Sequence, residues 1–291
     1  MKYPKRKESL RRICLLLCTV LTVLLTAGCK AGSQGSAPSE SGKDVLQVQF
    51  LKAGKADAII LQCGGETMVI DCGEEDDGDK VLDYLEKKGV QRVDVLMITH
   101  FDKDHMGGAA TVVKRIPVSR VLLPAYSGSG NVYDDLMAAL KSASVATENV
   151  TQTQSFDLGN AEVTVEPPAS YEVPDDGKDH DNDLSLITTV VFESKRLVFA
   201  ADIEKKRIRE WLDGGTAQPC DLLKVPHHGV YNKALKELFE TLKPSCAVIC
   251  DSSKNPADER TLQLLSECGA ACLQTKDGDV TISCDGENLI Y

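Results

Sequence analysis

The sequence has no excess of basic residues and no hydrophobic run long enough for repeated membrane crossings. Its 33 Lys and Arg residues stand against 44 Asp and Glu residues, so the formal charge is −11. An acidic chain of this kind repels phosphate backbones at long range, which excludes a broad basic nucleic-acid surface but not a local cationic or metal-lined site. The hydrophobic content of 42% and charged content of 26% also exclude a disordered or polytopic membrane protein.

The first 29 residues have the pattern of an export signal. Six Lys and Arg residues stand against one Glu in residues 1–12, an apolar run follows over residues 13–25, and Ala27-Gly28-Cys29 closes the segment. A positive flank, a short apolar core and small residues before a break are typical of a signal peptide, whereas a spanning helix needs about 20 apolar residues. The segment resembles a bacterial lipoprotein signal, which implies a lipid on Cys29; the alternative is an uncleaved helical anchor.

Three segments are therefore expected: a lipoprotein signal peptide over residues 1–28, a Gly/Ser-rich tether over 29–43 and one folded domain over 44–291. Removing residues 1–28 takes away six basic residues and one acidic residue, so the mature chain would carry a charge of −16. Either interpretation of the N-terminus predicts a domain at the outer face of the cytoplasmic membrane, tethered to it.

Cysteine gives a weaker indication of structure. An even set in an exported chain is compatible with disulfides. However, Cys63, Cys246 and Cys250 lie in or beside apolar runs, where cysteine acts as a small hydrophobic residue, so mostly free buried thiols are the favoured prediction. The eight cysteines after Cys29 are Cys63, Cys72, Cys220, Cys246, Cys250, Cys268, Cys272 and Cys284.

Apolar periodicity predicts strands alternating with helices, and hence an α/β fold. Residues 95–98 form a continuous apolar run, which is typical of a strand that is covered on both faces. The predicted strands are 45–51, 58–62, 68–71, 95–98, 120–123, one near 163, 186–192, 197–201, 222–225, 247–250 and a pair before 291. The predicted helices are 80–88, 133–140, 203–212, 233–242 and 257–268.

The densest chemical motif follows the strand at 95–98. Only five histidines occur in the chain, and two of them, His100 and His105, lie within six residues together with Asp102 and Asp104. Alternate side chains at a strand end point the same way, so these groups can converge and supply imidazole and carboxylate ligands to two neighbouring cations. The alternative is a charged turn that is exposed to solvent. Such a turn does not explain why two of the five histidines lie in this segment.

These residues resemble the His-x-His-x-Asp-His signature of the metallo-β-lactamase superfamily, with Asp102 in place of the middle histidine. This variant is similar to the extracellular hydrolase domain of ComEC-type DNA-uptake proteins and their free-standing relatives. Three further motifs carry the resemblance: residues 50–58 around a Gly-Lys-Ala-Asp turn, residues 69–73 (Val-Ile-Asp-Cys-Gly) and residues 222–229 (Leu-Leu-Lys-Val-Pro-His-His-Gly). The resemblance implies a four-layer αββα sandwich.

The resemblance also implies roles for the ligand residues. One cation would take His100 and Asp102, and a second would take Asp104 and His105. Asp202 matches the bridging carboxylate, although Asp is also a common helix N-cap. His227 is the expected last imidazole ligand and His228 the group that contacts the phosphate or donates a proton. Asp104 and His228 are thus the expected catalytic residues.

Further residues are expected around the ligands. Asp71 resembles the aspartate that orients a ligand in this superfamily, the alternative being a turn aspartate. Asn182 belongs to an Asn-x-x-Ser-Leu pattern that is similar to ComEC-type domains. His180 and Asp181 precede it in an acidic loop and either complete the first cation site or are merely solvated.

The predicted activity is metal-assisted hydrolysis, in which two divalent cations, zinc or manganese, activate a bridging water as hydroxide. The resemblance implies a phosphodiesterase or nuclease, with single-stranded DNA or another phosphodiester as substrate. Hydrolysis of a small ester, lactam or cell-wall phosphodiester is the alternative enzyme activity. A catalytically silent lipoprotein that keeps the metal fold to bind a partner is the alternative of another class.

Overall fold

The computed structural model describes residues 45–173, 176 and 180–291. The predicted signal peptide (1–28), the tether (29–43) and the lipidation site Cys29 lie outside the described residues. Among the described residues, no helix has both the length and the apolar character that a membrane crossing requires.

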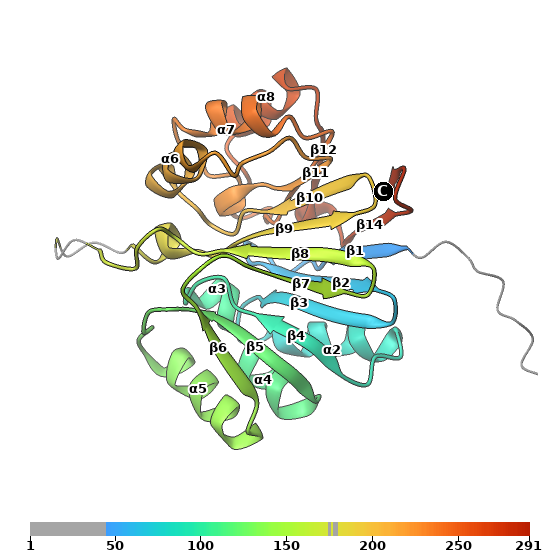
Figure 1. Ribbon diagram of the computed structural model, residues 1–291, viewed down its shortest axis with the longest axis vertical. Coiled ribbons are helices and arrows are strands. Elements are labelled where there is room, and N and C mark those ends of the chain that lie inside the picture. Colours follow the sequence, from blue (N-terminus) through green and yellow to red (C-terminus); the bar gives the residue numbers. More distant parts are fainter. Residues whose placement is uncertain (1–44, 174–175, 177–179) are drawn as a thin grey trace, which may run out of the picture. The chain divides into compact units, whose positions relative to one another are not determined.

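Two mixed sheets form the centre of the domain (Figure 1). The first sheet has the order β15-β14-β1-β2-β3-β4-β5-β6, in which β3 to β6 are parallel and the other neighbours antiparallel. Its strands are β1 (Leu46–Phe50), β2 (Ala58–Cys63), β3 (Glu66–Cys72), β4 (Val93–Met97), β5 (Val118–Pro124), β6 (Ala146–Val150), β14 (Val280–Cys284) and β15 (Leu289–Ile290).

The second sheet has the order β13-β12-β11-β10-β9-β8-β7, with β10 to β13 parallel and the others antiparallel. Its strands are β7 (Gln154–Leu158), β8 (Ala161–Glu166), β9 (Ile187–Phe192), β10 (Lys195–Phe199), β11 (Leu222–Lys224), β12 (Cys246–Ile249) and β13 (Ala271–Gln274). In each sheet the parallel strands therefore end at one common edge, where loops can gather side chains from several strands.

Helices cover the outer faces of both sheets (Figure 1). The helices α2 (Asp77–Lys87), α4 (Ala109–Arg115) and α5 (Asn131–Ala143) pack on the first sheet, and α6 (Lys205–Gly214), α7 (Leu235–Leu242) and α8 (Glu259–Glu267) pack on the second. The short helix α3 (Lys103–Met106) and the 3₁₀ turns η1 (Asp181–Leu184), η2 (Pro226–Gly229) and η3 (Thr275–Asp277) lie in the connections.

Three apolar cores hold these layers together. One core lies between the sheets, where the rings of Phe50 and Phe199 stack at a centroid distance of 6.1 Å. The other two lie between each sheet and its helices. The predicted four-layer αββα sandwich is thus confirmed.

Some elements differ from the sequence prediction. The strands β6 and β7 and the helix α4 were not predicted, and three strands rather than a pair follow α8. β6 is an edge strand whose first four residues are exposed, and it therefore has no alternating apolar pattern. Six of the eight described cysteines are buried, as expected for cysteines that act as small hydrophobic residues.

Candidate metal centre

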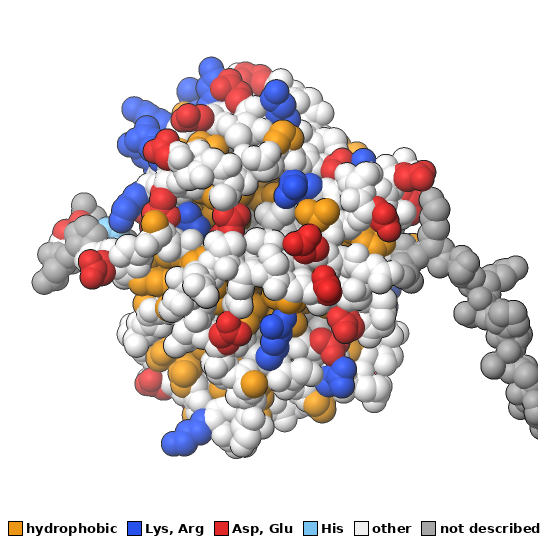
Figure 2. Space-filling view, viewed as in Figure 1, with side chains coloured by type: hydrophobic (Ala, Val, Ile, Leu, Met, Phe, Trp, Pro, Cys, Tyr) orange, Lys and Arg blue, Asp and Glu red, His pale blue; other side chains and the backbone are white. Residues whose placement is uncertain are grey.

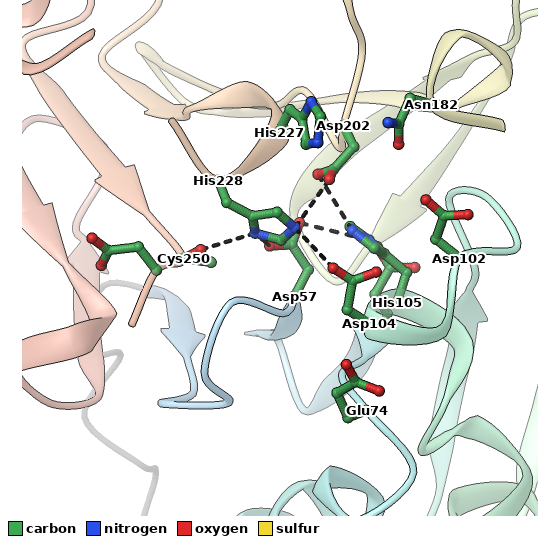
Figure 3. Close-up of polar contacts among 12 residues, drawn as sticks. Asp57, Glu74, Asp102, Asp104, His105, Asn182, Asp202, His227, His228 and Cys250 are labelled. Carbon is green, nitrogen blue, oxygen red and sulfur yellow. Dashed lines mark hydrogen bonds and ion pairs between the residues drawn. The ribbon is translucent and has the colours of Figure 1, made fainter. Parts of the chain in front are cut away.

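The ends of five strands, β3 and β4 of the first sheet and β10, β11 and β12 of the second, bring the candidate residues to one place (Figure 3). Asp71 lies at the end of β3, and the segment from Thr99 to His105 follows β4. Asp202 follows β10, the turn η2 with His228 follows β11, and Cys250 follows β12. The positions of these residues are thus fixed by buried strands rather than by free loops.

Close packing behind α3 holds His105 against the end of β3. A Cβ atom on Gly108 would lie 2.4 Å from the carbonyl oxygen of Cys72 and 2.5 Å from the backbone nitrogen of Gly78. Only glycine fits such a contact, so the Gly107-Gly108 pair allows the chain after His105 to approach the strand that carries Asp71.

Two histidines on the first sheet have their Nδ1 atoms engaged by neighbours. His105 Nδ1 lies 2.7 Å from Asp71 Oδ2, and His100 Nδ1 lies 3.0 Å from Thr99 Oγ1. Asp71 also accepts hydrogen bonds from the Thr99 backbone N–H at 2.8 Å and from the Thr99 hydroxyl at 2.7 Å. A carboxylate that is hydrogen-bonded to one ring nitrogen fixes the orientation of the imidazole and leaves the other nitrogen free to bind a ligand. Histidines that bind metal ions in proteins are held in the same way.

The same arrangement occurs on the second sheet. His228 Nδ1 lies 2.9 Å from the backbone carbonyl oxygen of Cys250. The Nε2 atoms of His100, His105 and His228 are all buried and lack a hydrogen-bond partner within the described part of the chain. Since buried polar atoms are nearly always paired, three unpaired imidazole nitrogens in one cluster need a common explanation, and a metal ion supplies one.

Asp202 lies between these imidazoles and presents one oxygen to each side. His105 Nε2 is 3.3 Å from Asp202 Oδ1, and His228 Nε2 is 3.0 Å from Asp202 Oδ2 and 3.4 Å from Asp104 Oδ2. Two ligand atoms at about 2 Å from one tetrahedral cation are about 3.3 Å apart, so these separations suit shared cations. The groups His100–His105–Asp202 and Asp104–His105–His228 each have their ligand atoms within 4.8 Å of one another.

Asp202 does not cap the following helix, which was the alternative for this residue. The helix α6 begins at Lys205, and its N-cap is Glu204. The carboxylate of Asp202 is instead buried in the cluster.

The sequence analysis missed two buried charged residues. The Nζ atom of Lys224 is fully buried and donates to the carbonyl oxygen of Ala201 at 2.8 Å, to Asp202 Oδ1 at 3.1 Å and to Asp57 through an ion pair. Asp57 also lies 3.6 Å from His228 Nδ1 through its Oδ1 atom. The sequence held a signal for each of them. Lys224 lies in the strand-like motif of residues 222–229, where a buried lysine requires a partner, and Asp57 ends the Gly-Lys-Ala-Asp turn.

The charges of the site favour two cations. Asp57, Asp71, Asp104 and Asp202 contribute four carboxylates, and Lys224 contributes one ammonium group. With neutral imidazoles three negative charges remain, and the partly exposed Asp102 adds a fourth. Buried charges are tolerated when they are neutralised, and two divalent cations supply the four positive charges needed.

The pKa values of the metal-free site reflect this crowding. Burial would raise the pKa of Asp104, but the close contact with His228 and the charges of His105 and His228 lower it to about 2. Burial would lower the pKa of His228, but Asp202 and the contact with Asp104 raise it to about 9. The pKa of Asp202 lies well below its usual value, because the two imidazoles and Lys224 outweigh its burial. The carboxylates and imidazoles of the cluster thus lie close enough to shift one another's pKa values.

Left-handed backbone conformations occur at the residues that carry or precede the ligands. The φ angles are 59° at Asp71, 47° at Ala201, 48° at His227 and 50° at His228. Such conformations cost on the order of 1–3 kcal/mol each for residues other than glycine, and they are typical of functional sites. Here they turn the chain sharply at the strand ends, which directs Asp71 and His228 toward the cluster and His227 toward Glu204.

The remaining predicted residues lie around the cluster. Asp102 Oδ2 is 3.5 Å from His100 Nε2. His227 is more exposed than His228, its Nδ1 lies 3.1 Å from Glu204 Oε1, and it belongs to none of the close ligand groups among the described residues. Burial lowers the pKa of His227, although Asp202 and Glu204 act in the opposite direction.

The acidic loop contributes one buried group. The Oδ1 atom of Asn182 is buried without a hydrogen-bond partner among the described residues, and its Nδ2 atom lies 3.5 Å from Glu204 Oε1. His180 lies 3.0 Å from Asp176 Oδ1 and is outside the close ligand groups. Asp181 begins η1 and is likewise outside these groups. Asn182 thus places a buried amide oxygen in the surroundings of the cluster (Figure 3).

Comparison with known proteins agrees with this geometry. The family described as the metallo-β-lactamase superfamily matches residues 51–250. ComE operon protein 3 of Bacillus subtilis (strain 168) is 28% identical over 202 residues, which are 68% of this chain and 25% of that protein. Recombination protein 2 of Haemophilus influenzae is 24% identical over 250 residues, which are 84% of this chain and 28% of that protein. The chain thus spans about a quarter of the length of these relatives.

A solved structure shows the same fold. The crystal structure of Tm1679, described as a metal-dependent hydrolase of the β-lactamase superfamily, superposes with a TM-score of 0.55 at 15% identity. The match covers 81% of this chain and 98% of that one. The family match over most of the folded domain and the buried His/Asp cluster lead to one conclusion: the chain belongs to the metallo-β-lactamase superfamily and carries the site of a metal-dependent hydrolase.

Proposed function

We propose that the protein hydrolyses phosphodiesters with the help of two divalent cations held around Asp202. The observation that carries this proposal is a cluster of three buried imidazoles around one buried carboxylate. The Nε2 atoms of His105 and His228 lie 3.3 and 3.0 Å from the two oxygens of Asp202, and His100 belongs to the same close ligand group as His105 and Asp202. A carboxylate with both oxygens available can serve two cations at once.

The distances support a specific division of the ligands. One cation would be held by His100, Asp102 and Asp202, and the other by Asp104, His105, His228 and Asp202. His228 replaces His227 as the proposed imidazole ligand, because its Nε2 atom is buried between two carboxylates while its Nδ1 atom is held by a backbone carbonyl. His227, which is partly exposed, is then placed to donate a hydrogen bond to the substrate.

The cations would supply Lewis acidity, which lowers the pKa of water and offsets negative charge that develops on the attacked phosphorus group. Asp71 and Thr99 hold the imidazoles of His105 and His100 in the required orientation. The proposed ligands include both carboxylates and imidazoles. Carboxylate oxygens suit manganese and imidazole nitrogens suit zinc, so either metal could occupy the site.

The choice of phosphodiesters rests on similarity. The motifs of residues 50–58, 99–108 and 222–229 resemble ComEC-type hydrolase domains, and Recombination protein 2 is among the matched relatives. The N-terminal pattern further supports a location at the outer face of the cytoplasmic membrane, through a lipid on Cys29. Single-stranded DNA that passes this face is the proposed polymeric substrate.

The location has a simple test. If Cys29 carries lipid, metabolic labelling with a radioactive fatty acid should label the wild-type protein and should not label Cys29→Ala, because that variant lacks the thiol that is acylated. Cys272→Ala, which removes an exposed thiol of the folded domain, serves as the control and should stay labelled. Equal labelling of Cys29→Ala and wild type would refute the lipoprotein assignment.

The activity is tested with a substrate panel in manganese and in zinc. We expect hydrolysis of bis-p-nitrophenyl phosphate and of single-stranded oligodeoxynucleotides, with loss of both activities after chelation and recovery after metal is restored. Nitrocefin and p-nitrophenyl acetate are included as a lactam and an ester. Turnover of these two alone would replace the proposed substrate class, and no turnover of any substrate would favour a catalytically silent binding protein.

A further inference from the structure

The two halves of the metal centre come from different sheets. The first sheet provides the ligands within residues 100–105, which follow β4, and the second sheet provides Asp202 after β10 and His228 after β11. The contact between the halves is close, since His105 Nε2 lies 3.3 Å from Asp202 Oδ1. The two sheets must therefore keep a fixed separation at this edge for both halves to bind the same cations.

One buried ion pair joins the two halves without a metal ion. Charged side chains are spread over the surface of the molecule (Figure 2), where water solvates them. Lys224 and Asp57 differ, because neither side chain is more than 1% exposed. Lys224 ends β11 of the second sheet, and its Nζ atom forms an ion pair with Oδ2 of Asp57 in the turn between β1 and β2 of the first sheet. We name these two residues the cross-sheet pair.

Each member of the cross-sheet pair also contacts a proposed metal ligand. Lys224 Nζ donates to Oδ1 of Asp202 at 3.1 Å and to the carbonyl oxygen of Ala201 at 2.8 Å. The backbone N–H of Asp57 donates to the carbonyl oxygen of Asp104 at 3.0 Å. A continuous path of polar contacts therefore runs from Asp104, through the cross-sheet pair, to Asp202.

The ammonium group of Lys224 has no hydrogen left for a substrate. An ammonium group has three N–H donors, and here the carbonyl oxygen of Ala201 and the carboxylates of Asp202 and Asp57 provide three acceptors. The contact leaves Asp202 able to bind a cation, because each carboxylate oxygen has two lone pairs. Lys224 therefore acts on Asp202 and not on the substrate.

Stability alone does not account for an ion pair at this place. Taking charges out of water costs several kcal/mol per ion, and replacing a buried pair by well-packed neutral side chains is often neutral or stabilising. The neighbouring residues of β11, Leu222 and Leu223, are buried and apolar. In the absence of cations, however, the carboxylates of Asp57 and Asp202 repel each other, and the ammonium group that contacts both offsets this repulsion.

We infer that Lys224 and Asp57 are positioning residues of the metal centre. They hold Asp202 in the orientation, and the loop of Asp104 at the distance, that shared cations require, so that the ligands are in place before a cation binds. The inference rests on the metal centre of the proposed function and is independent of the substrate. Residues that hold metal ligands in place typically contribute about tenfold to a hundredfold to metal affinity or activity, so the loss of the pair has a measurable effect.

The test is the double variant Asp57→Asn/Lys224→Met, which removes one negative and one positive charge together. Because the total charge of the site is unchanged, a change in metal affinity reports the position of the ligands. The control is Asp221→Asn/Lys195→Met, which removes a Lys–Asp pair with an N–O distance of 2.9 Å. That pair joins the beginning of β10 to the residue before β11, at the opposite end of these strands from the metal centre.

Manganese binding is followed by the EPR signal of the free ion, and the bound ions are inspected for the coupled spectrum that two manganese ions with a shared ligand give. In the double variant we expect the Kd for the second ion to rise about tenfold or more and the coupled spectrum to weaken. At saturating manganese, kcat for bis-p-nitrophenyl phosphate should fall about tenfold to a hundredfold, with a smaller change in KM. The melting temperature should match that of the control, which should keep wild-type manganese binding and kcat.

Unchanged manganese affinity, coupled spectrum and kcat in the folded double variant would overturn the inference. If that variant does not fold, Asp57→Asn/Lys224→Gln, which keeps hydrogen-bonding groups at both positions, replaces it with the same expected results. Failure of both variants to fold beside a folded control would assign the pair to folding and likewise overturn the inference. Pair-dependent manganese binding in a protein whose wild type hydrolyses no phosphodiester would refute the proposed function and support the positioning role.

Discussion

Replacing Asp202 by asparagine is expected to lower the hydrolysis of bis-p-nitrophenyl phosphate by about a thousandfold or more. The carboxylate has Oδ1 at 3.3 Å from His105 Nε2 and Oδ2 at 3.0 Å from His228 Nε2, so it serves both sides of the cluster. Asparagine keeps the shape but has one oxygen and no charge. Metal ions contribute several kcal/mol to catalysis, and a loss of about 4 kcal/mol corresponds to about a thousandfold in rate.

The control for this variant is Asp157→Asn, which changes an exposed carboxylate on the edge strand β7. It should keep wild-type activity and metal content. Circular dichroism and melting curves show whether Asp202→Asn folds, which separates lost catalysis from lost structure. Full activity in folded Asp202→Asn would contradict the bridging role and the mechanism built on it.

The fold could be predicted because its main elements have local signals. The continuous apolar run of residues 95–98 marks β4, which is buried between a helix layer and the second sheet. The elements that were missed lack such signals. β6 is exposed at a sheet edge, and α4 has only seven residues, which is too short to establish a helical period.

The candidate ligands could be found where they are close in sequence. His100, Asp102, Asp104 and His105 are gathered by one strand end and one short helix, so their spacing alone indicates convergence. Asp57 and Lys224 could not be assigned in this way. They come from different sheets and meet only because β11 ends opposite the turn between β1 and β2.

The roles of His227 and His228 depend on the backbone. Both residues have a left-handed φ angle in the turn η2, which directs adjacent side chains to different surroundings. His228 reaches the buried cluster and His227 reaches Glu204. A sequence shows that two histidines are adjacent, but the turn that separates them follows from contacts with β12 and the loop before α6.

These two histidines provide a matched pair of variants with a large expected difference. His228→Ala removes a nitrogen that lies 3.0 Å from Asp202 and 3.4 Å from Asp104, so we expect it to lose one cation and at least about a thousandfold in activity. His227→Ala removes a group that pairs with Glu204 outside the cluster. It should keep both cations and lose less activity, through weaker substrate contact.

Counting the divalent cations bound per chain is therefore the most direct test of a two-cation site around Asp202. Elemental analysis after reconstitution with manganese or zinc and removal of free metal should give about two cations for the wild type and His227→Ala, and about one for His228→Ala. A wild type that retains no cation would contradict the metal centre. A count that falls in His227→Ala and stays at two in His228→Ala would contradict the ligand assignment.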